Sequence, residues 1–380
     1  MHKLESFALS CGSKISKPHI EKTFFPIVDK KFICVSQQSL SQAEDYDFID
    51  DVIFHIKPYL DKEGIKIFEI GQSKKNQIFY SKSYSHLNVL QTSYLISNSL
   101  LYLGNLNLYT HLASYYGKPS VVPLNNQYSE IVRPYWSKED ECKLLTPDTD
   151  LKPYHSAQES PKTINQLQPE EVACAVLDSL SITHSLDKIE TVHTGEDYLN
   201  QIIDIIPGPF DVSGMNLDGL INLRMDKVFD LKFLSRCSSI KKFNLVSRNI
   251  IPIEYLNLLK DKIESISFFI DNQTEQQDIN ILSSIGKPLN LLCEDVKNIN
   301  EIRLKFIDYQ VKIFGKKSKK DLNVKAYSDL KFISKKNIIS NGQAYNSYLS
   351  LSVGENTSQV KNQKEFWEDL PFCRVFREKS

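Results

Sequence analysis

Hydrophobic and polar positions alternate between strand-like and helix-like patterns from Lys31 onward. A short apolar run, Phe32 to Val35, is followed by polar residues and then by Phe48 to Leu60, whose apolar side chains recur at helical spacing. Gly64 stands where a helix commonly ends, and a second apolar run extends from Ile65 to Ile70. The pattern predicts a strand, a helix and a second strand.

The same alternation continues to Leu124. It predicts helices over Leu90 to Ser97 and Tyr109 to Tyr116, and strands over Leu100 to Leu103 and Ser120 to Leu124. Short apolar strands separated by helices are typical of a parallel sheet with helices on both faces. The fold class predicted for this half is therefore α/β, with a parallel Rossmann-like sheet.

The end of the first domain is marked by a change in composition. Trp136 to Thr163 is rich in Pro, Asp, Lys and Ser, and we expect it to be an excursion on the surface. Pro169 and two acidic neighbours then begin an apolar stripe that predicts a closing helix. We place the boundary near Ser185, so that residues 1–185 form the Rossmann-like domain and residues 186–380 form a second one.

The second half carries an internal period of about 22 or 23 residues, and helical stretches separate its short apolar cores. The cores are Leu220 to Leu223, Phe243 to Val246, Ile266 to Ile270, Leu289 to Leu292 and Val311 to Phe314. One strand and one return helix per period predict a second α/β domain, either solenoid-like or doubly wound. Further on, Asn341-Gly342 predicts a hairpin turn, and we expect the aromatic tail, Phe366 to Phe376, to pack on this domain.

Composition narrows the classes of function. The 46 Lys and Arg nearly cancel the 47 Asp and Glu, which does not favour nucleic acid as a partner. The basic run Lys316 to Lys320 lacks the interleaved aromatic residues that stack on bases. The seven cysteines are scattered without metal-ligand spacing, so we expect free thiols and no metal site.

The expected location follows from the apolar runs. The chain shows no run of signal-peptide length at its start and no stretch of about 18 apolar residues. We therefore expect no membrane span and a cytoplasmic protein. Abundant Ile, Lys, Asn and Ser suggest an AT-rich genome, bacterial or phage.

Candidate chemistry lies at one edge of the predicted first sheet. Ligands of open parallel sheets bind beyond the carboxyl ends of the strands, where loop amides and helix amino termini face an anion. Small or polar residues follow the strands there: Ser36, Gln37, Gly71, Gln72, Ser73, Lys74, Gly104, Asn105 and Asn107. Together with His111, they predict a site for a phosphate-bearing ligand. The alternative interpretation is that loops are polar whether or not they bind anything.

One stretch has a more specific pattern. Gly104-Asn105, His111-Leu112-Ala113 and Gly117-Lys118-Pro119, followed by an apolar strand, resemble the donor-site segment of heptosyltransferase-type glycosyltransferases of the GT-B fold. The resemblance covers residues 30–182, the donor-binding half only. It implies binding of a nucleotide sugar as donor substrate, without a metal or other cofactor.

The sequence departs from that family in its motif, where Asn107 stands for the family's Ser and Leu108 for a small residue, and in the length of chain ahead of it. Leu106 stands where the family has Asp, and a leucine side chain cannot hydrogen-bond. About 30 residues precede the first strand, too few for the domain that carries the family's acceptor site and catalytic carboxylate. The sequence therefore leaves two functions open: a glycosyltransferase-like protein that binds a nucleotide sugar and transfers it, or a non-catalytic binding or assembly protein. For the second, the repeat-bearing half would contact a protein partner. No catalytic residue is assigned.

Overall fold

The chain divides into two compact units. Unit 1 comprises Met1–Glu190 with Lys379–Ser380, and unit 2 comprises Thr191–Glu378. The division falls within strand β7 (Ile189–Thr194), shortly after the expected boundary at Ser185. The computed structural model describes residues 1–71, 82–138, 140–213, 215, 217, 219–294, 297–314, 322, 329–360 and 364–379. The basic run Lys316 to Lys320 lies outside these residues.

Unit 1 is built on a six-stranded sheet, sheet A, in which neighbouring strands pair in parallel. In spatial order its strands are β3 (Lys82–Tyr84), β2 (Lys66–Ile70), β1 (Phe32–Ser36), β4 (Tyr102–Gly104), β5 (Ser120–Pro123) and β6 (Cys142–Leu145). The order of a Rossmann-type sheet, 3-2-1-4-5-6, is the one observed here.

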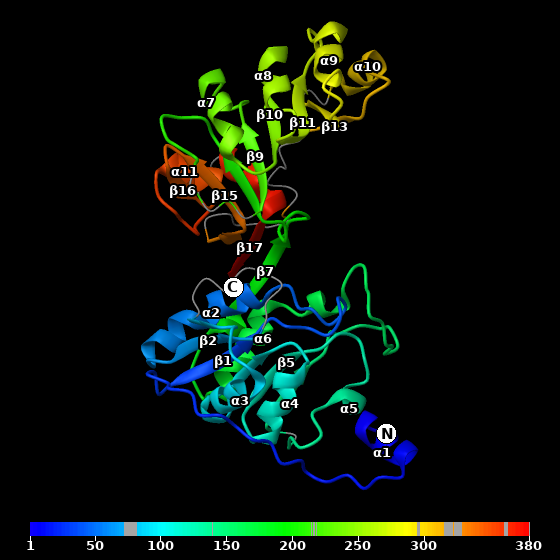
Figure 1. Cartoon of the computed structure of the whole chain (residues 1–380), viewed down its shortest axis with the longest axis vertical. Helices are drawn as coiled ribbons and strands as arrows, with labels where there is room; N and C mark the ends of the chain where they lie inside the picture. Colours follow the sequence, from blue (N-terminus) through cyan, green and yellow to red (C-terminus); the bar gives the residue numbers. More distant parts are fainter. Residues whose placement is uncertain are drawn as a thin grey trace. The chain divides into compact units, whose positions relative to one another are not determined.

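Helices cover both faces of sheet A (Figure 1). They are α2 (Ile49–Lys62) and α6 (Pro169–Ser179), which contact each other, and α3 (Val89–Asn98) and α4 (Leu108–Tyr115), which contact each other as well. Two shorter helices are α1 (Lys3–Cys11) and α5 (Ser129–Val132). Because β1 to β2 and β4 to β5 run in opposite directions along the sheet, right-handed crossovers place α2 and α4 on opposite faces.

The α/β class and the four strands expected in this half are confirmed. The expectation of a surface excursion over Trp136 to Thr163 is wrong in part, because β6 lies within it and pairs with β5. The edge of β5 offers unpaired backbone groups, and a four-residue strand needs little apolar patterning to occupy them. Cys142 at its start is buried between Leu106 and Val132 in one apolar cluster.

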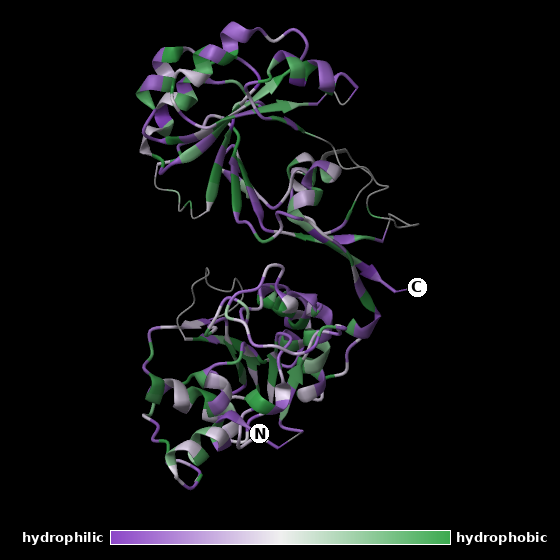
Figure 2. Ribbon diagram, turned by 90° about the vertical axis from the view of Figure 1, so that its right-hand side faces the viewer, coloured by the Kyte–Doolittle hydropathy of each residue, from purple (hydrophilic) through white to green (hydrophobic). Residues whose placement is uncertain are grey.

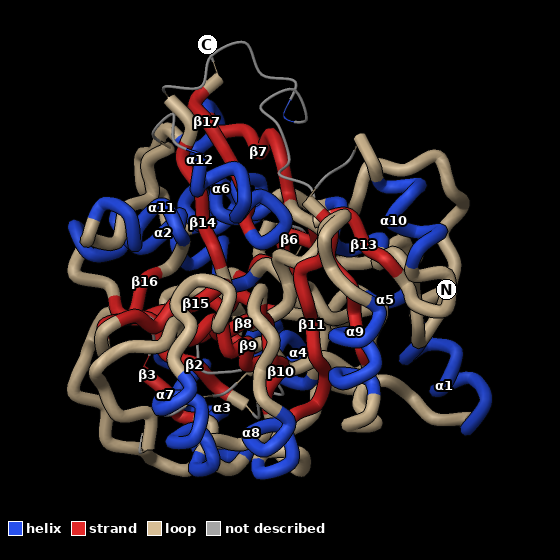
Figure 3. Tube along the Cα trace, turned by 90° about the horizontal axis from the view of Figure 1, so that it is seen from above, coloured by secondary structure: helices blue, strands red, loops and turns tan. Residues whose placement is uncertain are grey.

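Unit 2 is built on an eight-stranded sheet, sheet C. Its spatial order is β13 (Val311–Ile313), β12 (Leu289–Cys293), β11 (Ile263–Ile270), β10 (Phe243–Ser247), β9 (Leu220–Arg224), β8 (Ile202–Ile205), β15 (Lys336–Ser340) and β16 (Gln343–Tyr345). Figure 3 shows β8 to β11 side by side in this order. The prediction that the cores at Phe243, Ile266, Leu289 and Val311 are neighbouring parallel strands is confirmed.

The helices between these strands gather on one face of sheet C (Figure 2). They are α7 (Leu231–Arg236), α8 (Ile253–Leu258), α9 (Gln276–Ser283) and α10 (Ile299–Lys305). Their apolar side chains share one core with alternate strand positions, including Ile221, Leu245 and Leu291. The remaining strand positions point to the opposite face, which we call the open face of sheet C.

The last part of unit 2 packs beside β8. Asn341 and Gly342 both have positive φ and join β15 to β16, so the predicted hairpin turn is confirmed. Helices α11 (Tyr348–Val353) and α12 (Lys364–Asp369) follow. The aromatic tail contributes Phe366, Trp367 and Val375 to a buried cluster, as expected. Sheet B has the order β14 (Lys331–Ser334), β17 (Cys373–Glu378) and β7, the strand within which the division between the units falls.

Two general expectations concern cysteines and membranes. All seven cysteines are free thiols, of which only Cys11 is exposed. Among the residues described above, no helix combines the length and the apolar character that a bilayer span requires.

Candidate functional site

The carboxyl ends of β1 and β4 meet at the point where the strand order of sheet A reverses. Ser36 and Gly104, the last residues of these strands, are register partners. A Cβ atom on Gly104 would lie 2.3 Å from the carbonyl oxygen of Ser36 and 2.9 Å from the Tyr102 hydroxyl. Only glycine allows this approach, and the loops after the two strands are thereby brought together.

Asn105 joins the loop after β4 to the loop after β1. Its amide nitrogen donates to the carbonyl oxygen of Gln37 at 3.1 Å, and its amide oxygen accepts from the backbone N–H of Tyr46 at 3.1 Å. The Asn105 side chain is fully buried. It therefore fixes the path of the chain between β1 and α2.

Asn107 has two tasks at the same edge. Its amide oxygen accepts from the backbone N–H groups of Tyr109 and Thr110, which caps α4, and its amide nitrogen donates to the carbonyl oxygen of Gln38 at 2.7 Å. A capping side chain satisfies N–H groups that would otherwise be available to an anion. At this helix terminus the protein supplies the acceptor itself.

The sequence-predicted site residues fall into three groups. Ser36, Gln37, Gly104, Asn105 and Asn107 come together as a buried network, with Gly71 packed against Gln38 and the Tyr109 ring. Gln72, Ser73 and Lys74 lie outside the described residues. His111 is exposed on α4 and lines a pocket beside the network. Ligand binding by these residues stays a prediction.

That pocket, which we call the switch-point pocket, has a volume of about 420 Å³. Loops or helices that follow β1, β4 and β5 form it together with the start of α1. It is lined by His2, Lys3, Leu4, Leu40, Glu44, Leu106, His111, Ile131, Val132, Tyr135 and Trp136. Mainly apolar walls with a few polar groups are typical of small-molecule sites.

Aromatic rings and ionisable groups meet in the switch-point pocket. The His2 ring lies 5.0 Å from Tyr135, which lies 5.6 Å from Trp136, measured between ring centroids. Partial removal of water, with a smaller contribution from His2, lowers the pKa of His111. His111 is therefore neutral near pH 7 and can accept or donate a hydrogen bond. Glu44 is the carboxylate that lines the pocket.

Leu106 explains the apolar character of this pocket. Where the resemblance would place Asp, Leu106 is almost fully buried with Val122, Leu124 and Val132. The loop after β4 therefore packs against α5 through Leu106. An Asp here would bury a carboxylate among aliphatic side chains, which is costly without a partner.

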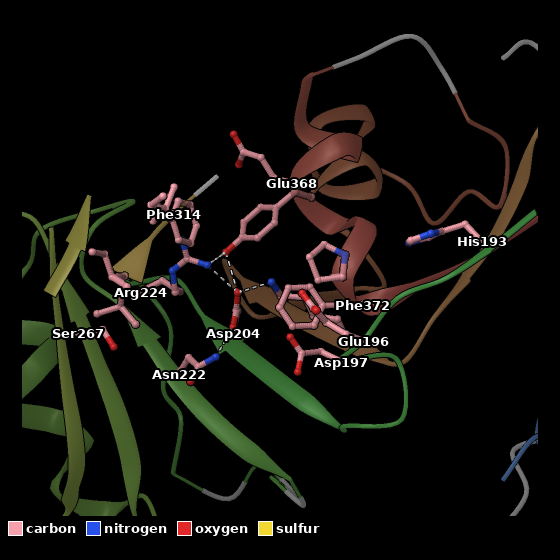
Figure 4. A pocket seen from close by; sticks show the side chains of 16 residues that line it. His193, Glu196, Asp197, Asp204, Asn222, Arg224, Ser267, Phe314, Glu368 and Phe372 are labelled. Carbon is pink, nitrogen blue, oxygen red and sulfur yellow. Dashed lines mark hydrogen bonds and ion pairs between the residues drawn. The ribbon is translucent and has the colours of Figure 1, made fainter. Parts of the chain in front are cut away.

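A second group of polar residues, which sequence reasoning did not find, lies on the open face of sheet C (Figure 4). Asp204 is fully buried, and its carboxylate accepts from Lys336 at 2.9 Å, from Arg224 at 2.8 Å and from the Tyr348 hydroxyl at 2.8 Å. Arg224 also makes two 2.7 Å hydrogen bonds to Asp226. The two cations and two carboxylates compensate one another.

Two carboxyl groups here, Asp204 in the cluster and Asp369 near it, have pKa values that are shifted in opposite directions. Burial raises the pKa of Asp204, but Lys336, Arg224 and Asn222 outweigh burial and hold it well below its ordinary range. Burial raises the pKa of Asp369 to about 7, although Lys336 and the N–H groups of Tyr348 and Leu349 oppose this. One oxygen of Asp369 has no hydrogen-bond partner among the described residues.

A weak sequence signal for the cluster existed. Asp204, Asn222 and Asn244 occupy outward positions in consecutive strands whose inward positions are apolar. Lys336 and Tyr348 lie 112 or more residues after Arg224 in the chain, and no sequence pattern links them to it. No group of three or more His, Cys, Asp or Glu in the described part of the chain is arranged to hold a metal ion.

No protein-family model and no curated protein matches the chain. Among solved structures, E. coli ADP-heptose LPS heptosyltransferase II matches at 14% identity and a TM-score of 0.32, over 41% of this chain and 48% of that one. An E. coli heptosyltransferase with ADP matches at 11% and 0.33, over 46% and 54%. The glycosyl transferase family 9 protein from Veillonella parvula matches at 13% and 0.31, over 47% and 50%. This chain spans about half the length of those proteins. The likeness is a distant one to a glycosyltransferase-like fold, and it assigns no residue a role.

Proposed function

We propose that unit 1 binds a nucleotide sugar in the switch-point pocket. The observation that carries the proposal is position: the pocket lies at the carboxyl edge of a parallel sheet, where the strand order reverses between β1 and β4. Ligands of open α/β sheets bind in this crevice. The resemblance of the Gly104 to Pro119 segment to a glycosyltransferase donor site supplies the ligand class.

The lining fits the two ends of such a ligand. Tyr135 and Trp136 offer rings on which a base can stack. Lys3 and His111 offer a cation and a titratable donor for the phosphates. The Asn107 cap leaves less of the α4 terminus for the anion, so the side chains carry more of the phosphate contact.

Binding to His111 has a consequence for pH. A phosphate beside the imidazole favours its protonated form, whereas in the free protein restricted hydration of the ring, together with His2, lowers the pKa of His111. Binding therefore takes up a proton, and affinity should rise as pH falls towards the ordinary histidine range.

Transfer of the sugar is the second step of the proposal. It requires a group that accepts a proton from the acceptor hydroxyl, and Glu44 is the candidate because its carboxylate lines the pocket. Release of nucleoside diphosphate from a nucleotide sugar measures this step, and Glu44→Gln should release it at least tenfold more slowly than the wild type does. If the variant and the wild type release it equally fast, Glu44 is not the base.

The binding test uses the two tryptophans of the chain. Trp136 lines the pocket and Trp367 is buried in unit 2, so a Trp367→Phe background reports on Trp136 alone. Titration with ADP-, UDP- and GDP-sugars should quench Trp136 fluorescence, more strongly at about pH 6 than at about pH 8.

His111→Ala and His155→Ala form a matched pair for this test. Both histidines are exposed in unit 1, but only His111 lines the pocket. We expect roughly tenfold weaker binding in the first, the equivalent of one charged hydrogen bond, and no change in the second. The proposal fails if no nucleotide sugar changes Trp136 fluorescence, or if the two variants bind alike.

A further inference from the structure

The open face of sheet C carries a ladder of hydrogen-bonded polar side chains. Asn222 donates to Asp204 at 2.9 Å, Asn244 donates to Asn222 at 3.2 Å, and Ser265 donates to Asn244 at 2.7 Å. These four residues are register partners on β8, β9, β10 and β11. Parallel strands are usually apolar on both faces, so a polar row across four of them needs an explanation.

A pocket of about 800 Å³ lies on this face, wholly within unit 2 (Figure 4). Its floor includes Arg224, Val246 and Ser267, which are register partners on neighbouring strands. Val246 and Ser267 are half-buried, so the floor is accessible. The backbone of the floor is hydrogen-bonded to neighbouring strands of sheet C.

The two ends of the pocket differ in character. At one end the compensated cluster of Asp204, Arg224 and Lys336 forms the wall, with Tyr348 above it. At the other end Leu292 and Phe314 supply apolar surface. The ligand must accordingly present polar groups and apolar surface close together.

The pocket lining offers both donors and acceptors of hydrogen bonds. Lys336 is nearly buried, and its ammonium group donates to Asp204 and lies 4.2 Å from the centre of the Phe372 ring and 4.8 Å from that of Tyr348. The Ser267 hydroxyl makes no hydrogen bond to any residue that the structure describes. Asp197 lines the pocket as an acceptor, held by its backbone N–H to the Pro371 carbonyl at 2.8 Å.

Charge at this wall argues against a strongly charged ligand. A free anion would lie near Asp204 and Asp197, and Glu196 and Glu368 add two more carboxylates to the lining. A free cation would lie near Arg224 and Lys336, and Glu368 is already paired with Lys227 at 3.6 Å. Both charge signs are already present and partly satisfied, so a net charge on the ligand gains little. An uncharged group that both donates and accepts hydrogen bonds fits better.

We propose that this pocket binds a neutral carbohydrate. Each sugar hydroxyl donates and accepts, which suits a pocket lined by Lys336 and Asp197 with the Ser267 hydroxyl on its floor. The C–H face of a sugar ring suits an aromatic side chain, and Phe314 lines the pocket. Every residue belongs to unit 2, so the site does not depend on the nucleotide-sugar proposal.

The test begins with the full chain on an array of immobilised oligosaccharides, both neutral and charged. Binding to neutral glycans is expected, followed by calorimetry with the strongest neutral binder. Binding to none of the neutral glycans, or to charged glycans alone, overturns the proposal. Binding that persists in the presence of a mild detergent shows that the glycans are not held by nonspecific contact with the apolar end of the pocket.

Variants then locate the site. Ser267→Trp fills the pocket without removing a hydrogen bond to a described residue and should abolish binding; Ser267→Leu, a smaller change, should weaken it at least tenfold. Asn257→Ala, an exposed change on α8 at the other side of the sheet, is the matched control and should bind as wild type. Equal binding by folded Ser267→Leu and Asn257→Ala would refute the site.

The outcome is separable from that of the first proposal. Ser267→Trp should leave the Trp136 response to nucleotide sugars intact, and His111→Ala should leave carbohydrate binding intact. Loss of both responses in either variant would contradict two independent sites.

Discussion

At the scale of single residues, the surroundings of a buried group set its pKa and the substitutions that it tolerates. Asp369 is the clearest case, because its side chain is fully buried and burial raises its pKa to about 7. Since the folded state holds this proton more tightly than an unfolded chain does, Asp369 stabilises the fold most at low pH. That contribution is lost as pH rises between the ordinary value of 3.8 and about 7.

We therefore predict a pH-dependent difference between wild type and Asp369→Asn. An amide oxygen can still accept from the N–H of Tyr348, which lies 2.7 Å from the carboxylate. Relative to the variant, the wild type should be more stable at about pH 5 than at about pH 8. Thermal unfolding at both pH values measures this difference. A difference that does not change with pH would show that Asp369 does not titrate in this window.

Gly104 gives the second prediction at this scale. A methyl group there would meet the Ser36 carbonyl at 2.3 Å, so Gly104→Ala should destabilise unit 1 by about 1–3 kcal/mol, the usual cost of overpacking. Gly117→Asn is the control, because Gly117 has positive φ, which Asn tolerates, and open space around its Cβ position. Denaturant unfolding should separate the two, and equal stability would contradict the close contact.

At the scale of elements, the N-cap residue of α4 also holds the loop after β1. Asn107 caps α4 and also donates to the Gln38 carbonyl, whereas Asn88 caps α3 from an exposed position. An Asp at either position still accepts from the helix N–H groups. Only at residue 107 would it place a buried carboxylate against a carbonyl oxygen.

We predict that Asn107→Asp costs about 1–3 kcal/mol and that Asn88→Asp stays within about 0.5 kcal/mol of wild type. Chemical denaturation of the two variants is the measurement. If the two variants lost equally little stability, the hydrogen bond from Asn107 to the Gln38 carbonyl would be energetically unimportant. Other contacts would then have to hold the loops around the switch-point pocket.

At the scale of the whole molecule, each unit has its own core. Gly104 belongs to unit 1, and Leu245 lies at the centre of the core of unit 2. Mutations in separate cores usually act independently. We predict two unfolding transitions in calorimetry. Gly104→Ala should lower the midpoint temperature of one transition, and Leu245→Ala should lower that of the other by reducing the free energy of unfolding of unit 2 by about 2–5 kcal/mol.

A single transition that both variants shift would contradict this independence. The double variant provides the check: its two shifts should equal those of the single variants. A larger combined loss would indicate that the units stabilise each other.

The sequence by itself determined the α/β class, the strands of sheet A near Phe32, Ile65, Leu100 and Ser120, and the sequential strands of sheet C. These follow from local pattern, because a buried strand must be apolar and a helix must end near glycine or polar residues. Edge strands such as β3 and β6 escaped prediction, since pairing along one side demands little of their sequence.

Only the tertiary structure decided which side chains meet. Asn105 and Asn107, which are predicted to line a ligand site, also hold the loops after β1 and β4 together, because the close approach at Gly104 brings carbonyl groups within their reach. Asp204, Arg224, Lys336 and Tyr348 come from four elements and form one buried cluster. Hydrogen bonds and ion pairs depend on distances of a few ångströms, and chain folding, not spacing along the sequence, sets those distances.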